Sequence, residues 1–323
     1  MLLSVLLVLA GAGLLLVGGE LLVRGAASLA RSLGISAMVV GLTVVALGTS
    51  APEFVVSVLA AIRGNAAICA GNIVGSNILN ILLVLGATAL ICPLRASASF
   101  VRREVPVMAV VSLLVWYFAG NGTLSPIEAA VLLALLAAYT VYIVWIARRE
   151  RASVHREFDA EQTCVRRSLL GDTVMVVAGL GILAGGSEVF LRGAVDVAER
   201  LGMSETLIGL TLVALGTSLP ELAASLIAAY RKHPDICLGN LVGSCIYNLL
   251  WIGGTAGLVG MTGEARGLPF DAGMRSLHLP VMVFSAVMLW PIIVTGRRVS
   301  RREGAFLLLV YVAYTVWIIW NRA

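Results

Sequence analysis

The amino-acid sequence predicts an all-α membrane protein with ten transmembrane helices, arranged as two inverted five-helix repeats. Apolar residues make up 59% of the 323 residues, charged residues make up 13%, and the mean hydropathy is +0.98. Soluble domains are about 45–50% apolar and about 25% charged, so a soluble fold is excluded. The apolar runs are long enough for helices that cross about 30 Å of hydrocarbon, and they do not alternate as barrel strands do. The third observation is an internal repeat with an offset of 168 residues.

The expected helices follow from the apolar runs and the charged or turn-rich breaks between them. In chain order they lie near residues 2–30, 37–62, 66–91, 104–119, 125–147, 171–198, 205–229, 235–260, 274–296 and 303–321. The one long polar segment, residues 148–170, carries six arginines and four acidic residues and is interpreted as a linker. The predicted organisation is therefore a first repeat at residues 1–147, this linker, and a second repeat at residues 171–323.

The orientation in the membrane follows from the distribution of basic residues. Each predicted half has an odd number of spans, so the second half enters from the opposite side, and such repeats place their site near mid-membrane. Sixteen of the 23 Lys and Arg residues lie on the side of the linker and five on the other. The positive-inside rule then predicts a cytoplasmic (inner) membrane protein with a cytoplasmic linker and both termini outside. Basic loops facing anionic lipid explain the net charge of +5, so no nucleic-acid partner is expected. A monomer suffices, and the oligomeric state stays open.

Both copies of the repeat place a carboxylate within an apolar run. Residues 41–53 (GLTVVALGTSAPE) and 209–221 (GLTLVALGTSLPE) are identical at 11 of 13 positions. Residues 71–80 (GNIVGSNILN) and 239–248 (GNLVGSCIYN) are identical at 7 of 10. Carboxylates, amides and hydroxyls inside hydrocarbon are costly and mark functional sites. We therefore expect the function to reside in these four segments.

Two prolines are expected to break the second and seventh spans. Pro52 and Pro220 each remove a backbone donor, and a Gly-Thr-Ser run lies just before each of them. Such breaks free carbonyl oxygens, here expected from Ala46 and Ala214 or their neighbours. The residues expected at the site all offer oxygen: Glu53, Thr49, Ser50, Ser76, Asn80 and Ala46 in the first copy, and Glu221, Thr217, Ser218, Ser244, Asn248 and Ala214 in the second.

This donor set indicates a hard cation. Ca²⁺ takes about six to eight oxygen ligands, and Na⁺ accepts the same donors. Two carboxylates facing each other in a dry site repel, and one Ca²⁺ or two Na⁺ would balance their charge. A site that can be neutralised in either way is suited to exchange. The five cysteines and three histidines show no metal-ligand spacing, so zinc chemistry is not expected.

Each of these features also has a structural interpretation. A proline kink, or a Ser or Thr bonded to its own helix, is structural more often than functional. Two symmetric carboxylates in broken helices, each matched by an Asn in the next span, make that interpretation insufficient. Glu20 and Arg24 form an i,i+4 pair and are expected to neutralise each other, as are Glu188 and Arg192. The glycines of the first and sixth spans predict close helix packing, with sliding as a further option.

GTSAPE and GTSLPE, each followed by a GN-x-V-G-S segment that ends in Asn, resemble the paired α-repeats of the cation/calcium antiporter (CaCA) superfamily. The resemblance is closest to the prokaryotic sodium/calcium exchangers and spans all ten predicted helices. It implies the sodium/calcium exchanger fold, in which spans 2, 3, 7 and 8 form the ion-binding core and spans 1 and 6 slide to alternate access. It also implies that the residues named above coordinate the ions.

The resemblance implies a secondary antiporter, not an enzyme, that needs no cofactor and moves Ca²⁺ outward against an inward Na⁺ gradient. Asn248 departs from the pattern, because several sodium/calcium exchangers have Asp there. Asn keeps the oxygen donor but carries neither a charge nor a proton, so a proton/calcium or potassium-dependent cation antiporter is the alternative. The occluding inverted repeat argues against a channel, and no nucleophile or metal constellation indicates an intramembrane hydrolase. A structural scaffold would not account for the duplicated carboxylates.

Overall fold

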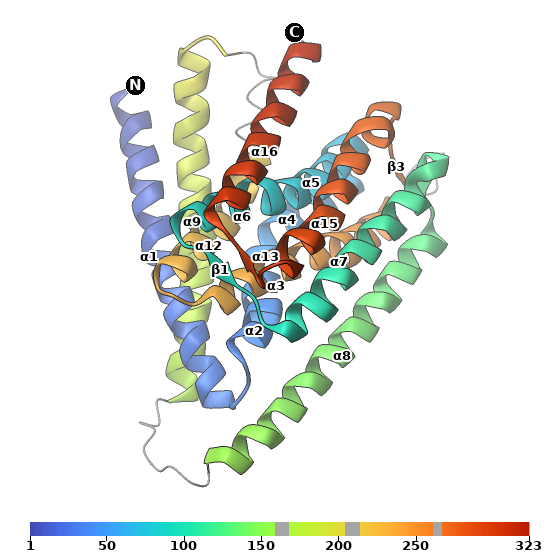
Figure 1. Ribbon diagram of the computed structural model, residues 1–323. Coiled ribbons are helices and arrows are strands. Elements are labelled where there is room, and N and C mark those ends of the chain that lie inside the picture. The colour runs from blue at the N-terminus through green and yellow to red at the C-terminus, as the bar shows by residue number, and fades with distance from the viewer. Residues whose placement is uncertain (159–167, 204–213, 261–266, 323) are drawn as a thin grey trace.

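The structure, a computed structural model, describes residues 1–158, 168–203, 214–260 and 267–322, and Figure 1 shows that they form a bundle of helices. The α-helices are α1 (Leu2–Leu33), α2 (Ala37–Val40), α3 (Ala46–Thr49), α4 (Ala51–Ile62), α5 (Ala66–Ile78), α6 (Leu85–Ile91), α7 (Ala98–Phe118), α8 (Pro126–Phe158), α9 (Leu169–Arg200), α11 (Ala214–Thr217), α12 (Leu219–Tyr230), α13 (Pro234–Tyr247), α14 (Gly253–Val259), α15 (Leu279–Val294) and α16 (Arg301–Arg322). In the described segments, the π-helical turns are η1 (Gly41–Val45), η2 (Leu79–Val84), η5 (Asn248–Ile252) and η6 (Met274–His278), and η3 (Ala119–Asn121) is a 3₁₀ turn. The strands are β1 (Leu94–Arg95), β2 (Thr123–Leu124), β3 (Leu268–Pro269) and β4 (Arg298–Val299).

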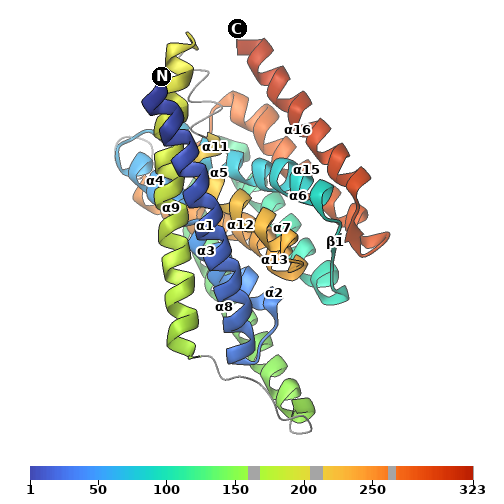
Figure 2. The same cartoon turned by 90° about the vertical axis from the view of Figure 1, so that its left-hand side faces the viewer.

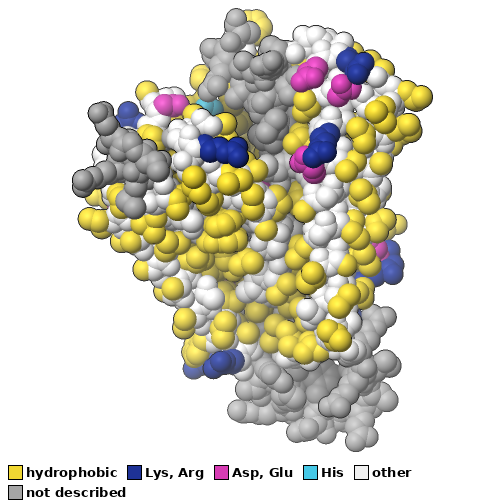
Figure 3. All heavy atoms as spheres, turned by 180° about the vertical axis from the view of Figure 1, so that it is seen from behind, with side chains coloured by type: hydrophobic (Ala, Val, Ile, Leu, Met, Phe, Trp, Pro, Cys, Tyr) yellow, Lys and Arg dark blue, Asp and Glu magenta, His cyan; other side chains and the backbone are white. Residues whose placement is uncertain are grey.

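The described helices make this a multi-pass membrane protein. Seven of them are long and apolar enough to cross a bilayer: Leu2–Leu33, Ala67–Ile91, Pro126–Arg149, Leu169–Arg200, Pro234–Val259, Met274–Val294 and Arg301–Trp320. An eighth is the pair Ala37–Thr49 and Ala51–Ile62, which is bent by 44° at its break. On the face seen in Figure 3, hydrophobic side chains cover the middle and charged ones lie mostly toward the two ends.

The remaining two expected spans are helical where they are described. Helix α7 has 21 residues but carries Arg102, Arg103 and Glu104 near its start, which lowers its hydropathy. It begins at Ala98, earlier than the sequence predicts, because the Ser97 hydroxyl caps it by accepting the Phe100 amide at 3.2 Å. Helix α12 has 12 apolar residues, and residues 204–213, expected to begin its span, lie outside the described residues.

The predicted linker is partly helical. Helix α8 continues to Phe158 and α9 begins at Leu169, so the first residues of the segment 148–170 extend a helix. Residues 159–167, including Cys164, lie outside the described part of the chain. The start of α8 is fixed by a capping box, in which Glu128 accepts the Ser125 amide at 2.8 Å and the Ser125 hydroxyl at 2.7 Å.

Helices α1 and α9 lie side by side and antiparallel, as Figures 1 and 2 show. Glycines bring their backbones together, as the sequence predicts. A Cβ atom added to Gly18 would lie 2.8 Å from the Leu183 amide nitrogen, and one added to Gly179 would lie 2.6 Å from the Leu22 amide nitrogen. This close approach leaves no room for side chains along the contact.

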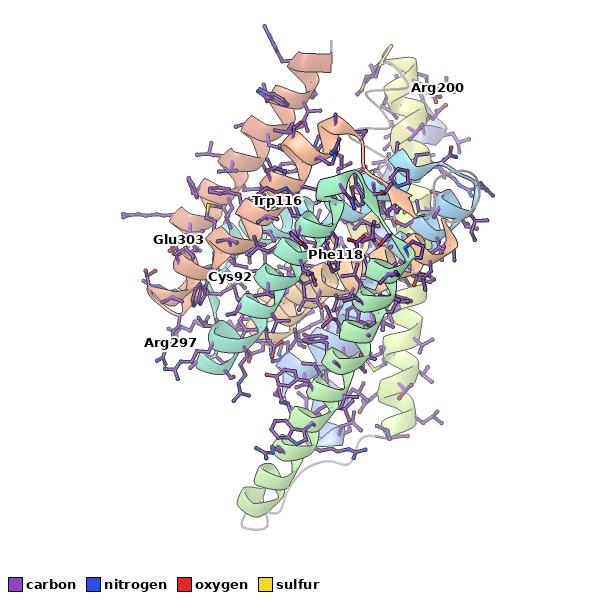
Figure 4. All side chains as sticks on the ribbon, turned by 90° about the vertical axis from the view of Figure 1, so that its right-hand side faces the viewer. Cys92, Trp116, Phe118, Arg200, Arg297 and Glu303 are labelled. Carbon is purple, nitrogen blue, oxygen red and sulfur yellow. The ribbon has the colours of Figure 1, made fainter. Side chains whose placement is uncertain are left out.

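The most buried helices form the centre of the bundle. The segments Ala67–Ile91 and Pro234–Val259 are 78% and 94% buried along their apolar windows, against 11–39% for the other long apolar helices. Two short antiparallel ladders join the halves, since β1 pairs with β4 and β2 pairs with β3. Figure 4 shows Cys92, Arg297 and Glu303 at the side of the molecule where the ends of α6 and α16 meet.

Candidate cation site

The two prolines break their helices at corresponding positions, as predicted. Pro52 and Pro220 are the second residues of α4 and α12. The residues at the breaks leave the helical conformation, with φ −80° and ψ 1° at Ser50 and φ −92° and ψ 6° at Ser218. Each break places an acid, Glu53 or Glu221, in the first turn of the helix that follows it.

The two asparagine-bearing helices share a second irregularity. Helix α5 passes into the π-helical turn η2 around Asn80, and α13 passes into η5 at Asn248. A π-helical turn rotates the following residues relative to a regular helix and is frequent at functional sites. Both asparagines are buried, at 0% and 1% exposure.

The two acids of the repeat are buried and lie near each other. Glu53 and Glu221 are 1% and 0% exposed. The Ser218 hydroxyl donates to Glu53 Oε1 at 3.2 Å, and the Ser50 hydroxyl donates to Glu221 Oε1 at 3.3 Å. Ser50 and Ser218 stand three residues before Glu53 and Glu221, so these crossed bonds bring the two carboxylates close together. Each acid is therefore held by a serine from the other half of the chain.

The threonines also form hydrogen bonds between the two halves of the chain. Thr49 Oγ1 donates to Asn240 Oδ1 at 3.0 Å, and Thr217 Oγ1 donates to Asn72 Oδ1 at 3.1 Å. In these two bonds each donor and each acceptor differs from its counterpart by 168 residues. The hydrogen-bond pattern thus has an approximate two-fold symmetry that interchanges the halves.

Asn72 and Asn240 are polar residues of this network that the sequence analysis did not select. Their side-chain amides donate to Ser57 Oγ at 2.8 Å and to Ser225 Oγ at 3.1 Å, respectively. Asn72 Nδ2 also lies 3.2 Å from the Glu53 carbonyl oxygen. A signal was present in the sequence, since Asn72 precedes Ser76 and Asn80 at steps of four residues and so shares their helix face.

Two further serines extend the network. The Ser218 hydroxyl lies 3.4 Å from that of Ser76, and the Ser244 hydroxyl lies 3.4 Å from both the Thr49 hydroxyl and the Ala46 carbonyl oxygen. These bonds join the selected residues up to Ser76 and Ser244 in one cluster where α3, α4, α5, α11, α12 and α13 meet, except Ala214, whose side chain lies outside the described ones. Asn80 and Asn248 are buried and follow Ser76 and Ser244 by one helical turn.

One of the two carbonyls expected to be freed, that of Ala46, is not freed. The Ala46 carbonyl keeps an intrahelical bond, accepting the Ser50 amide at 3.0 Å, although it also faces the Ser244 hydroxyl. Proline has no backbone N–H, so the carbonyl four residues before it loses its usual intrahelical partner. In this chain those carbonyls belong to Gly48 and Gly216. Gly216 receives a replacement, because the Ser187 hydroxyl of α9 donates to its carbonyl oxygen.

Several polar atoms of the cluster have no hydrogen-bond partner among the described residues. They are Glu53 Oε2, Glu221 Oε2, and both amide atoms of Asn80 and of Asn248, and all are buried. Buried polar atoms are nearly always paired, and each exception calls for an explanation. These atoms belong to four residues that the sequence selects as cation ligands. Oxygen atoms in this arrangement suit a hard cation.

No basic side chain balances the two acids within the described part of the chain. The ion pairs there join Glu20 with Arg24 and Arg231, Glu188 with Arg192, and Asp196 with Arg200. No group of three or more His, Cys, Asp or Glu residues gathers there either. The polar groups of the cluster are thus two carboxylates together with amides and hydroxyls.

Comparison with known proteins identifies the family. The model of the sodium/calcium exchanger protein family matches residues 3–145 and 172–320, which are most of the chain. The chain belongs to this family. Among the relatives of the chain, "Putative antiporter CaxA" of Alkalimonas amylolytica is 38% identical over 272 residues, with 83% of each chain covered. The sodium/calcium exchanger MaX1 of Methanosarcina acetivorans is 31% identical over 306 residues, covering 84% of this chain and 85% of that one.

Solved structures of a sodium/calcium exchanger have the same fold. A structure of NCX_Mj soaked with Na⁺ and Sr²⁺ aligns with a TM-score of 0.82 at 30% identity and covers 97% of both chains. NCX_Mj soaked without Na⁺ and Ca²⁺ aligns with a TM-score of 0.81 at 31% identity over 99% of both chains. The exchanger fold and the resemblance to the CaCA superfamily are therefore confirmed, and the chain is a membrane transporter of that superfamily.

Proposed function

We propose that this protein is a secondary antiporter that exchanges Ca²⁺ for Na⁺ across the cytoplasmic membrane by alternating access. Ten spans in two inverted repeats, at residues 1–147 and 171–323, would carry the site between them. The linker would lie in the cytoplasm and both termini outside. The family, the exchanger structures with the same fold and the reciprocal hydrogen bonds between the halves support this proposal.

One observation carries the proposal: the unpaired buried oxygens of Glu53, Glu221, Asn80 and Asn248. Two carboxylates in one dry cluster are unstable unless cations neutralise them. One Ca²⁺ or two Na⁺ would do so, with the two amide oxygens completing the ligand set. The hydroxyls that hold the other carboxylate oxygens keep the acids in place while the ions change.

Obligatory exchange follows from the same charges. If the cluster moved empty between the two sides of the membrane, two uncompensated carboxylates would pass through a closed and dry state, which is costly. Crossing is therefore favoured only when cations are bound. Such a rule couples outward movement of Ca²⁺ to inward movement of the counter-ion without ATP.

Uptake of radioactive calcium into proteoliposomes tests the coupling ion. We expect uptake when an outward Na⁺ gradient is imposed with pH clamped and K⁺ equal on both sides. A proton gradient alone should then drive little uptake. Uptake driven by the proton gradient and indifferent to Na⁺ would reject the sodium coupling and favour the proton/calcium alternative, and a strict need for K⁺ would favour the potassium-dependent one.

Replacing Asn248 with Asp is expected to make transport sensitive to acid. The substitution puts a third carboxylate into a cluster that has no basic side chain in the described residues, so a proton or a further cation must bind there. Calcium uptake measured between pH 6 and pH 8 should fall on acidification more steeply, by at least about threefold, than in the unaltered protein. The matched control is Asn240→Asp, which makes the same substitution at a residue whose amide is already bonded to Thr49 and Ser225. Identical pH profiles for Asn248→Asp and the unaltered protein would contradict this role of Asn248.

A further inference from the structure

Two arginines occupy equivalent places at the ends of the broken helices. Arg63 follows α4 with φ −82° and ψ 2°, and Arg231 follows α12 with φ −78° and ψ 5°. The next residue is left-handed in both copies, with φ 76° at Gly64 and φ 61° at Lys232. The backbone therefore presents one arginine in the same way at each end of the two-fold arrangement.

Among the described residues, Arg231 forms an ion pair with the α1–α9 pair and Arg63 does not. Arg231 Nε lies 2.9 Å from Glu20 Oε2, and Arg231 Nη2 lies 2.6 Å from Glu20 Oε1. This bidentate ion pair joins α1 to the residue that follows α12, across 211 residues of sequence. Glu20 also keeps the predicted pair with Arg24 on its own helix, and its side chain is 26% exposed.

The equivalent pair in the other half is open. Glu188 corresponds to Glu20, yet it pairs with Arg192 on its own helix at 2.7 Å and its side chain is 57% exposed. No ion pair joins Glu188 to Arg63 in the part of the chain that the structure describes. The helices show the same difference, because α1 and α9 both pack along α12, whereas neither packs comparably along α4.

We propose that these residues form two alternating latches: a first latch of Glu20 with Arg231, closed in this structure, and a second latch of Glu188 with Arg63, open in this structure. The inference rests on the proposed alternating access. An approximate two-fold axis that interchanges the halves also interchanges the latches. Movement of the α1–α9 pair relative to α4 and α12 would open the first latch as it closes the second.

The latches act on the balance between the two states. Exchanging one partly exposed ion pair for an equivalent one leaves the two states close in free energy, as a reversible transporter requires. Loss of one latch should shift the population by about two- to fivefold toward the state that keeps the other, the range expected for a partly exposed ion pair. Neither latch residue needs to contact an ion to have this effect. With the orientation proposed above, the first latch lies toward the cytoplasm and the second toward the outside.

Cross-linking tests the latches independently of transport. The full chain with its five cysteines replaced receives Glu20→Cys with Arg231→Cys, or Glu188→Cys with Arg63→Cys, and each pair is treated with a short thiol-to-thiol reagent. We expect both pairs to cross-link in membranes, the second pair to a smaller extent. Adding Arg231→Gln to the second pair should raise its cross-linking by about two- to fivefold, since the competing latch is lost. Arg200→Gln on the second pair is the matched control, because Arg200 pairs with Asp196 and neither residue belongs to a latch, so the yield should change little.

Failure of the second pair to cross-link while the first pair does would overturn the latch proposal, as would a yield unaffected by Arg231→Gln. Neither outcome depends on Ca²⁺ or Na⁺, so a defect in the proposed exchange would be seen separately in the uptake assay. The swapped pair Glu20→Arg with Arg231→Glu keeps the opposite charges in exchanged positions. If this variant restores the populations of the two states to those of the unaltered protein, the charge pair itself, and not the shape of either side chain, sets them.

Discussion

Replacing Glu221 with Gln is expected to abolish Ca²⁺ transport, and Glu53→Gln is expected to do the same to a similar extent. Each acid is fully buried, lies near the other acid, and has one carboxylate oxygen without a hydrogen-bond partner. Removing one charged partner from a buried ionic contact costs about 3–5 kcal/mol, which corresponds to a loss of more than about 100-fold in Ca²⁺ affinity. Calcium uptake into proteoliposomes measures the effect.

The same variants should fold. In the absence of ions, neutralising one of two neighbouring carboxylates removes a repulsion, so the melting temperature of either variant should equal or exceed that of the unaltered protein. The increase in melting temperature on adding Ca²⁺ should disappear. Glu199→Gln, which changes an exposed acid at the end of α9, should leave uptake and the Ca²⁺-dependent melting shift unaltered. Normal uptake by both Glu53→Gln and Glu221→Gln would disprove the site.

Replacing Gly179 with Val is expected to separate α1 from α9 and to reduce both stability and transport. The first added carbon would lie 2.6 Å from the Leu22 amide nitrogen and 2.9 Å from the Gly18 carbonyl oxygen. Both neighbours are backbone atoms, so neither can rotate away and the helices must move apart. Overpacking of this kind costs about 1–3 kcal/mol. Thermal unfolding and Ca²⁺ uptake of the purified protein give the two readouts.

The opposite face of the same turn of α9 provides the control. A carbon added at Gly181 meets no atom within 4 Å, so Gly181→Val introduces the same side chain in the same helix without a collision. It should keep both the melting temperature and the rate of uptake. If Gly179→Val behaved like Gly181→Val, close glycine packing of α1 against α9 would not be needed for the transporter.

The repeat allowed much of the site to be predicted from sequence. Duplicated acids, each just after a proline that a Gly-Thr-Ser run precedes, indicated the two broken helices and both carboxylates. Proline alone would not have sufficed, since Pro106 and Pro291 lie inside α7 and α15 without ending them. Asn80 and Asn248 were selected as members of the duplicated segment, so the repeat, and not a single residue type, carried the prediction.

Other features depend on packing between distant segments. The π-helical turns at Asn80 and Asn248 have no signature in the residue pattern, and Asn72 and Asn240 gain their role only when a threonine from the opposite half reaches them. The contact of Glu20 with Arg231 could not be foreseen either, because the i,i+4 partner Arg24 already accounted for that acid. Nor does spacing decide that the Ala46 carbonyl keeps its intrahelical bond at the break.

The crossed bonds of Thr49 with Asn240 and of Thr217 with Asn72 also bear on the origin of the chain. A protein of half this length would carry the donor, the acid and the acceptor, yet it would bring none of these donors to its acceptor. Two copies inserted in opposite directions and pressed together would satisfy both bonds at once. The two crossed bonds are those that two such copies, joined in one polypeptide, would make, and joining leaves the two sides free to differ, as they do at Asn77 and Cys245.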